Sequence, residues 1–157
     1  MEKDKVTYLT IEGEKKLRAE LEELSGPVRH ELSKRLRSAI QMGDLSENAD
    51  YKQAKEDQGF IEGRIQELIQ LLGNVVIIDE NSKPKDTVEI GSKVTIQESG
   101  EPKETYLLVG PQEADPVKGR ISYSSPIGVA LIGHKAGETV TAETPVGPIK
   151  FKILEIQ

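Results

Sequence analysis

The stretch MGDLSENADY, residues 42–51, decides the fold because it separates two long segments whose apolar residues recur with helical spacing. Upstream, apolar residues recur at steps of three or four from Leu17 to Ala39. Downstream, the same spacing runs from Ala54 to Leu72. Two helices of similar length with so short a connection are expected to lie antiparallel and to pack their apolar stripes together. The spacing therefore predicts an antiparallel coiled-coil hairpin with residues 42–51 at its tip.

The first helix of this hairpin is predicted over residues 10–42, with Thr10 as its candidate N-cap. Gly13 stands where a capping box would have Glu, so the helix start is not fixed by this motif. The triplet SGP, residues 25–27, interrupts the apolar spacing. Because Pro inside a helix removes a hydrogen bond, we expect a kink or a one-turn break there.

After Gly73 the sequence changes to β-branched runs separated by Gly and Pro, which is typical of strands and turns. A short helix is expected within residues 125–133, and the polar segment 79–86 is the best candidate linker. The predicted fold class is α+β, with a coiled-coil hairpin over residues 1–80 and a small globular domain over residues 81–157. The predicted strands are 75–79, 87–98, 104–110, 119–124, 138–145 and 147–156.

Composition excludes several functional classes. The chain has 157 residues, a net charge of −6, no Cys and no Trp. Disulfides and cysteine zinc sites are therefore excluded, and general attraction to duplex phosphates is not expected. No run of eighteen apolar residues predicts a membrane span. We expect a soluble, cytoplasmic protein.

Asp44 and Glu47 are the candidate functional residues of the tip. Their spacing of three places them on one face if the segment is helical. The same spacing also fits a variant capping box, with Asp44 as the N-cap and Glu47 at the third helical position. Spacing alone favours the capping interpretation, but capping does not explain why a long hairpin carries these acids at its end.

The segment GDLSENADYKQAKEDQGFIEGRI, residues 43–65, closely resembles the signature of the GreA/GreB family of bacterial transcript-cleavage factors, and GreA members are the nearer match. The resemblance extends to LTIEGEKKLRAELEEL near the start of the chain. It also includes ISYSSPIGVALIGHKAGETV and TPVGPIKFKILEI near the end, so nearly the whole chain is covered.

This resemblance implies that the hairpin enters the secondary channel of RNA polymerase and that a globular domain with an FKBP-like fold docks on the channel rim. Asp44 and Glu47 would then help to hold a second Mg²⁺ that is shared with the polymerase active site. Two carboxylates are too few for a tight Mg²⁺ site of their own. The implied function is to stimulate cleavage of the RNA 3′ segment in backtracked complexes, as a monomer that is not itself an enzyme.

Further contacts follow from the residues near the tip and from the resemblance of residues 122–133. Basic residues behind the tip suit RNA, although a solvated helix face is an equal alternative. Ile40 departs from the family, in which many GreA members have Arg at this position. The candidate contacts to RNA or the channel are Arg37, Ser46, Asn48, Tyr51, Lys52 and Lys55; the candidate docking residues are Asp115, Ser125, Pro126 and Ile127.

Two other functions are compatible with parts of the sequence. A channel inhibitor of the anti-Gre type would occupy the same site, but the intact GDLSENADY motif argues against it. A peptidyl-prolyl isomerase is suggested by the FKBP-like resemblance, but its pocket would need several convergent aromatic side chains. Residues 81–157 offer only Tyr106, Tyr123 and Phe151. Turn and capping roles for Ser46 and Asn48, and packing of Tyr51 on the hairpin, also remain open.

Overall fold

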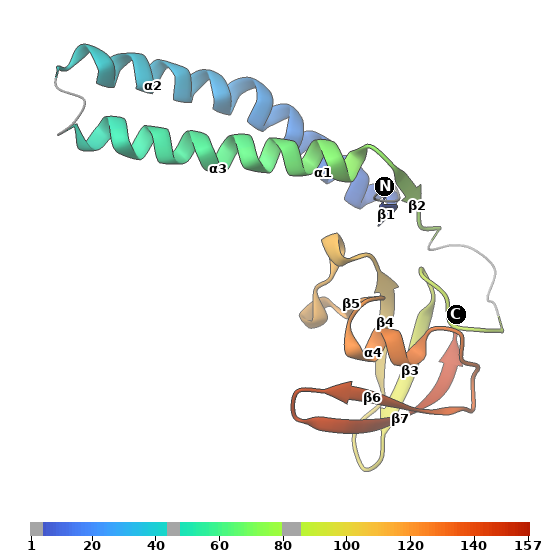
Figure 1. Cartoon of the computed structure of the whole chain (residues 1–157). Coiled ribbons are helices and arrows are strands. Elements are labelled where there is room, and N and C mark those ends of the chain that lie inside the picture. The colour runs from blue at the N-terminus through green and yellow to red at the C-terminus, as the bar shows by residue number, and fades with distance from the viewer. Residues whose placement is uncertain (1–4, 44–47, 80–85) are drawn as a thin grey trace. The chain divides into compact units, whose positions relative to one another are not determined.

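The computed structural model describes residues 5–43, 48–79 and 86–157 (Figure 1). The chain divides into two compact units: Glu14–Val75 makes up most of the first, and Thr7–Gly13 with Val76–Gln157 makes up the second. A helical hairpin followed by a sheet-containing domain confirms the α+β class. The boundary expected at residues 80/81 stays a prediction, because 80–85 lie outside the described residues. No helix in the described ranges is long and apolar enough to cross a membrane.

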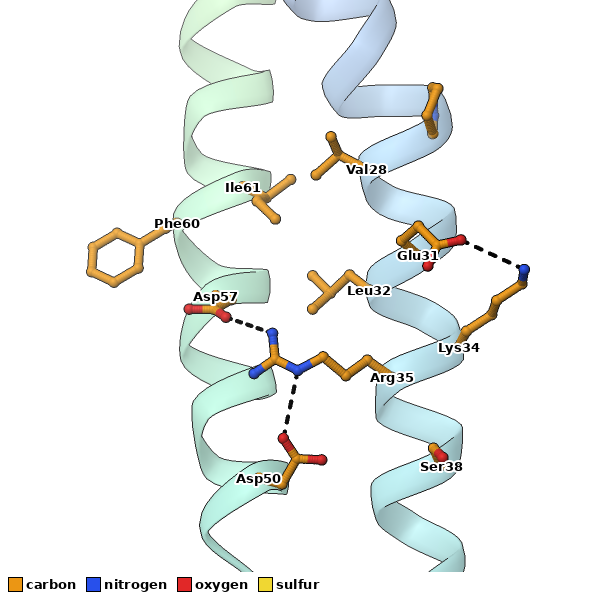
Figure 2. A pocket seen from close by; sticks show the side chains of 11 residues that line it. Val28, Glu31, Leu32, Lys34, Arg35, Ser38, Asp50, Asp57, Phe60 and Ile61 are labelled. Atoms are coloured by element: carbon orange, nitrogen blue, oxygen red, sulfur yellow. Dashed lines mark hydrogen bonds and ion pairs between the residues drawn. The ribbon is translucent and has the colours of Figure 1, made fainter.

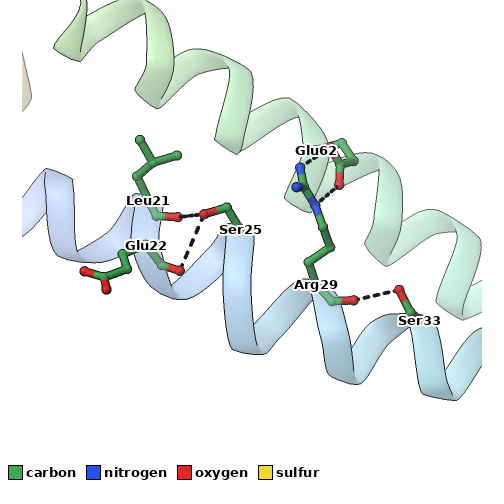
Figure 3. A network of polar contacts seen from close by, with 6 residues as sticks. All are labelled: Leu21, Glu22, Ser25, Arg29, Ser33 and Glu62. Atoms are coloured by element: carbon green, nitrogen blue, oxygen red, sulfur yellow. Dashed lines mark hydrogen bonds and ion pairs between the residues drawn. The ribbon is translucent and has the colours of Figure 1, made fainter.

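The hairpin has the predicted helices and the predicted interruption. Around residues 25–27 the first helix changes to a π-helical segment that contains Pro27. The Ser25 hydroxyl donates a hydrogen bond to the Leu21 carbonyl at 2.6 Å, so a side chain joins the helix hydrogen bonding at this point (Figure 3). The elements are α1 (Ile11–Glu23), the π-helix η1 (Leu24–Val28), α2 (Arg29–Gln41) and α3 (Ala49–Leu72).

The apolar stripes form the buried seam of the hairpin. Ala39 and Ala54, both fully buried, are the small members of the seam nearest the tip. Leu17 and Leu36 are only half-buried, because a pair of helices covers one side of each stripe. The buried seam residues are Leu32, Ala39, Ala54, Ile65 and Leu68.

Ion pairs between helices lie beside this seam. Arg29 reaches from α2 to Glu62 of α3 with two hydrogen bonds of 2.8 and 2.9 Å (Figure 3). Arg64 of α3 forms the same kind of bidentate pair with Glu20 of α1, with hydrogen bonds of 2.6 and 3.0 Å. Paired hydrogen bonds between a guanidinium and a carboxylate depend on geometry. They therefore favour one register of α3 against α1 and α2.

The second unit contains a five-stranded sheet in the order β5-β4-β3-β7-β6. All neighbouring strands are antiparallel except β4 and β5, which are parallel. Leu131 of α4 (Pro126–Leu131) is buried with the inward side chains of the sheet, including Phe151 and Ile153. The strands are β3 (Lys93–Glu98), β4 (Glu104–Val109), β5 (Arg120–Ser122), β6 (Thr139–Thr144) and β7 (Gly147–Ile156).

The strand expected over residues 87–98 is shorter than predicted. A turn occupies its first half: the Ser92 amide donates to the Glu89 carbonyl at 3.0 Å, and Gly91 has a φ of +94°. This positive φ is incompatible with a continuous strand, so β3 starts only at Lys93. The error arose because Val88 and Ile90 continue the β-like spacing through the turn.

A two-stranded sheet, formed by β1 (Thr7–Leu9) and β2 (Val75–Ile77), was only half predicted, because β1 was not expected. A three-residue strand is too short to show a period of two. Residues 7–13 belong to the second unit, where the Tyr8 ring meets the Tyr123 ring edge-on at 5.6 Å. Gly110 permits this close approach, since a Cβ there would overlap the Tyr8 carbonyl.

Replacing Gly59 or Gly63 by Ala should stabilise the hairpin. Both glycines lie within α3, and a Cβ at either would meet no atom within 4 Å. Because Gly in a helix interior costs about 1 kcal/mol relative to Ala, each variant should gain roughly that amount in urea unfolding. Gly110→Ala is the control and should destabilise. Helix variants no more stable than the wild type would contradict this account of α3.

Candidate functional site

Helix ends bracket the tip of the hairpin. α2 ends at Gln41 and α3 begins at Ala49. Asp44, Ser46 and Glu47, which the sequence nominates for metal and RNA contacts, lie outside the described residues. The structure therefore defines the helices on either side of these three candidates.

Asn48 is the N-cap of α3. Its Oδ1 accepts a hydrogen bond from the Tyr51 amide at 3.0 Å. Its Nδ2 donates to the Ala39 carbonyl at 2.8 Å, across the hairpin. The capping-box interpretation of Asp44 and Glu47 falls outside the described residues and stays a prediction, whereas Asn48 is the residue that caps α3. The capping role expected as one alternative for Asn48 is confirmed, and both the oxygen and the nitrogen of its side-chain amide form hydrogen bonds within the hairpin.

The basic residues behind the tip fall into two groups. Arg35 binds Asp57 at 2.8 Å and also lies 3.6 Å from Asp50, while Lys34 is 3.5 Å from Glu31. The second group, Arg37, Lys52 and Lys55, is exposed. Among residues 5–43, 48–79 and 86–157, these three form no ion pair, and Lys55 donates to Gln58 at 3.2 Å. Only the second group has its charge available for a partner.

Arg35 spans an open groove between α2 and α3 (Figure 2). Leu32 and Ile61 point toward each other from the two helices. The Arg35 guanidinium, through its hydrogen bond, lowers the pKa of Asp57 below its usual range, and Gln53 contributes a second hydrogen bond. The groove has a volume of about 880 Å³ and is lined by Pro27, Val28, Glu31, Leu32, Lys34, Arg35, Ser38, Asp50, Asp57, Phe60 and Ile61.

The candidate docking residues of the second unit surround α4. Ser125 is the N-cap: its Oγ accepts a hydrogen bond from the Gly128 amide at 3.1 Å and donates to the Ser122 carbonyl at 2.7 Å. Pro126 is exposed at the first helical position, as expected. Ile127 is half-buried and packs against the core of the sheet. Pro126 is therefore the freer of these two apolar candidates to meet a partner.

Asp115 is held at the start of β5. Its amide donates to the Arg120 carbonyl at 2.8 Å, and its carbonyl accepts from the Arg120 amide at 3.0 Å. The Asp115 side chain is 42% exposed and lies 4.0 Å from Lys118. Ser125 binds Ser122 at the other end of β5, so this strand connects the two docking candidates.

The sequence reasoning missed Glu113. This residue ends the short 3-10 helix η2 (Pro111–Glu113), and its carboxylate binds Thr10. The sequence signal for it was Gly13: this residue stands where a capping box has Glu, so the carboxylate that binds Thr10 has to come from elsewhere in the chain. Within the described ranges, no group of three or more His, Asp or Glu residues is arranged to hold a metal ion.

Comparison with known proteins gives two family matches. The model described as "Transcription elongation factor, N-terminal" matches residues 7–77, and the model described as "Transcription elongation factor, GreA/GreB, C-term" matches residues 83–157. Together they account for nearly the whole chain.

Individual relatives agree with these matches. "Transcription elongation factor GreA" of Roseiflexus castenholzii is 46% identical over 155 residues, which cover 98% of this chain and 99% of the relative. The protein of the same name from Leuconostoc mesenteroides is 48% identical over 148 residues, covering 94% and 92%. The crystal structure of GreA factor homolog 1 (Gfh1) of Thermus thermophilus is 30% identical, with 98% and 99% coverage and a TM-score of 0.45.

Replacing Arg35 by Gln should raise the pKa of Asp57 toward its ordinary value, as followed by NMR titration of the carboxyl carbon. The return should be incomplete because the Gln53 hydrogen bond remains. A lowered pKa means that the pair stabilises the wild type above the unfolded pKa of about 4, and that this contribution disappears as pH falls through the folded pKa. The variant should show a smaller acid-dependent loss of stability, because only the Gln53 hydrogen bond still lowers the pKa of Asp57.

Glu20 is the internal control for that titration. Arg64 lowers its pKa by a separate hydrogen bond, so Arg35→Gln should leave Glu20 unchanged. An Asp57 pKa that stays low in the variant would show that Arg35 is not its cause.

Proposed function

Because the chain belongs to the GreA/GreB family of transcription elongation factors, we propose that it acts on RNA polymerase and stimulates Mg²⁺-dependent cleavage of the RNA 3′ segment in backtracked, arrested complexes. The observation that carries this proposal is the match of both family models over residues 7–77 and 83–157. The protein is an activator, and the bond-breaking activity belongs to the polymerase.

The hairpin is the part proposed to enter the secondary channel. α3 has 24 residues and is therefore about 36 Å long at 1.5 Å per residue. The buried seam and the ion pairs between helices hold α3 against the first helix. Such a hairpin suits delivery of a few side chains into a deep site while most of the protein stays outside.

Asp44 and Glu47 are proposed to hold a second Mg²⁺ together with carboxylates of the polymerase. Hydrolysis of a phosphodiester with two metal ions requires one ion to stabilise the leaving oxygen and one to deliver a hydroxide. Mg²⁺ usually keeps several waters and takes one or two protein carboxylates with substrate phosphates. Two acids at the tip are therefore enough to complete a shared site. The proposal is supported by the family match and by the finding that Asn48 supplies the N-cap of α3.

RNA contact is proposed for the exposed residues near the tip. Arg37, Lys52 and Lys55 are free of ion pairs within the described part of the chain, so their charges are available to phosphates. Tyr51 is half-buried and is proposed to stack on a base. Ser46 and Asn48 complete the proposed set, although the amide of Asn48 is already occupied by Tyr51 and Ala39.

Docking on the channel rim is proposed for the second unit, through Asp115, Ser125, Pro126 and Ile127. The support is the exposure of the Asp115 carboxylate and of Pro126 at opposite ends of β5. Ser125 and Ile127 would contribute mainly by fixing the start of α4, because one caps it and the other packs on the core.

The metal proposal predicts that Asp44→Asn combined with Glu47→Gln abolishes cleavage while binding to polymerase persists. The neutral amides keep the size of the side chains but remove the anionic ligands that Mg²⁺ prefers. RNA length in a stalled, backtracked complex would be followed across a Mg²⁺ titration, and the variant should cleave only when Mg²⁺ is raised well above the ordinary level.

Glu56→Gln is the matched control for this experiment, because Glu56 is an exposed acid of α3 that lies more than two turns beyond Glu47 in sequence. It should cleave like the wild type. Wild-type cleavage by the double variant at ordinary Mg²⁺ would refute the metal-holding role. Inhibition without cleavage by the wild-type protein would instead indicate a channel inhibitor.

The docking proposal predicts that Asp115→Lys weakens polymerase binding by about tenfold, equivalent to about 1.4 kcal/mol. The backbone pairing with Arg120 does not involve the side chain, so the fold should be retained in circular dichroism. Glu143→Lys makes the same charge change at an exposed position of β6 and serves as the control. Equal affinities for the two variants in a binding titration would place the docking surface elsewhere.

A further inference from the structure

We propose that Glu113 is a positioning residue: from the second unit, it supplies the carboxylate that completes the N-terminal cap of α1 and so anchors the start of the hairpin. This inference rests on the proposed function, because the hairpin is the part that would carry Asp44 and Glu47 to the reaction. Thr10 and Glu113 are 103 residues apart in sequence, and both belong to the second unit.

The cap itself consists of three hydrogen bonds. Thr10 Oγ1 accepts from the Gly13 amide at 3.0 Å, as an N-cap residue does. The same hydroxyl donates to Glu113 Oε1 at 2.5 Å, and the Thr10 amide donates to Glu113 Oε2 at 2.8 Å. In an ordinary capping box, the third helical residue provides the carboxylate that accepts from the N-cap amide. Here Glu113 takes that role from a distant part of the chain.

Gly13 makes room for this arrangement. It occupies the third helical position, where a capping box would have Glu, and it is buried. A Cβ at Gly13 would overlap the Glu113 carboxylate. Glycine in a helix is otherwise unfavourable by about 1 kcal/mol, so its presence here is explained by the incoming carboxylate.

Glu113 is held rigidly enough to act in this way. Its side chain is only 9% exposed, and Arg120 lies 3.6 Å away. The Glu113 amide donates to the Gly110 carbonyl at 3.1 Å within η2. A buried carboxylate is stable only if it is paired, and Thr10 with Arg120 provides that pairing. Removing the Thr10 hydroxyl therefore also removes one hydrogen bond from the buried Glu113 carboxylate.

The position of the cap gives it a functional consequence. α1 is one continuous helix whose first turn belongs to the second unit, whereas the helix from Glu14 onward belongs to the first. A firm cap at Thr10 therefore defines where the hairpin starts. Glu113 is also two residues from the docking candidate Asp115, and both contact Arg120. The loop proposed to dock on polymerase thus also holds the start of the hairpin.

The test compares Glu113→Ala with Glu143→Ala, an exposed control on β6. Amide hydrogen exchange measured by NMR should become about tenfold faster at Thr10 and Gly13 in Glu113→Ala alone. The Thr10 amide loses its acceptor, and the Thr10 hydroxyl that accepts from the Gly13 amide is no longer held by Glu113. In backtracked complexes, the maximal cleavage rate should fall about tenfold. The protein concentration for half-maximal cleavage should stay within about twofold, because the docking candidates are unchanged.

Thr10 provides a second pair of variants that leaves Glu113 in place. Thr10→Val removes the hydroxyl at nearly constant volume and should reproduce the faster exchange at Gly13 and the lower maximal rate. Thr10→Ser should restore both. This rescue would not be expected if position 10 mattered only for packing, because Ser lacks the methyl group and Val retains its volume.

The outcomes separate this inference from the proposed function. Wild-type exchange at Thr10 and Gly13 in Glu113→Ala would overturn the cap. Faster exchange with an unchanged maximal cleavage rate would overturn the positioning role. If the wild-type protein stimulates no cleavage at all, the proposed function fails and the positioning role fails with it, while the exchange data still decide whether Glu113 caps α1.

Discussion

The narrow apolar seam between α2 and α3 is the constraint on which the rest of the hairpin depends. A pair of helices buries one stripe of each, so few residues exclude water and the remaining faces stay polar. Register must then come from contacts that depend on direction. The two-pronged Arg29–Glu62 pair and the Asn48 amide between Tyr51 and Ala39 provide such contacts along and at the end of the seam. Because only one stripe of each helix is buried, the chain needs an apolar content of only 36%.

Apolar spacing was sufficient to predict the hairpin, and the chemistry of Pro27 and Ser125 was sufficient to predict its interruption and the N-cap of α4, because each depends on residues close in sequence. Choosing the N-cap of α3 was harder, since Asp44, Ser46 and Asn48 are all good capping residues. The outcome depends on the Ala39 carbonyl of the opposite helix, which gives Asn48 a second hydrogen bond. No local motif contains that information.

The charges of the candidate site were also only partly predictable from sequence. Sequence identified a basic stretch behind the tip but could not separate Arg35, which is neutralised by Asp57, from Arg37, which is exposed. That separation depends on how α2 and α3 are rotated about the seam. Contacts between distant segments set a related limit. β1 pairs with β2, about 70 residues later, and Thr10 binds Glu113, 103 residues later; a single sequence contains no record of such contacts.

The assignment of residues 7–13 to the second unit bears on how this protein can be recombined with its relatives. A chimera that takes everything before residue 76 from one parent and the rest from another would divide the globular unit between the two. Positions 13 and 113 would then have different origins, and any side chain at 13 would collide with the carboxylate at 113. An exchange of hairpins is therefore compatible with this architecture only if both junctions lie within residues 14–75. Residues 7–13 then come from the same parent as the sheet that they belong with.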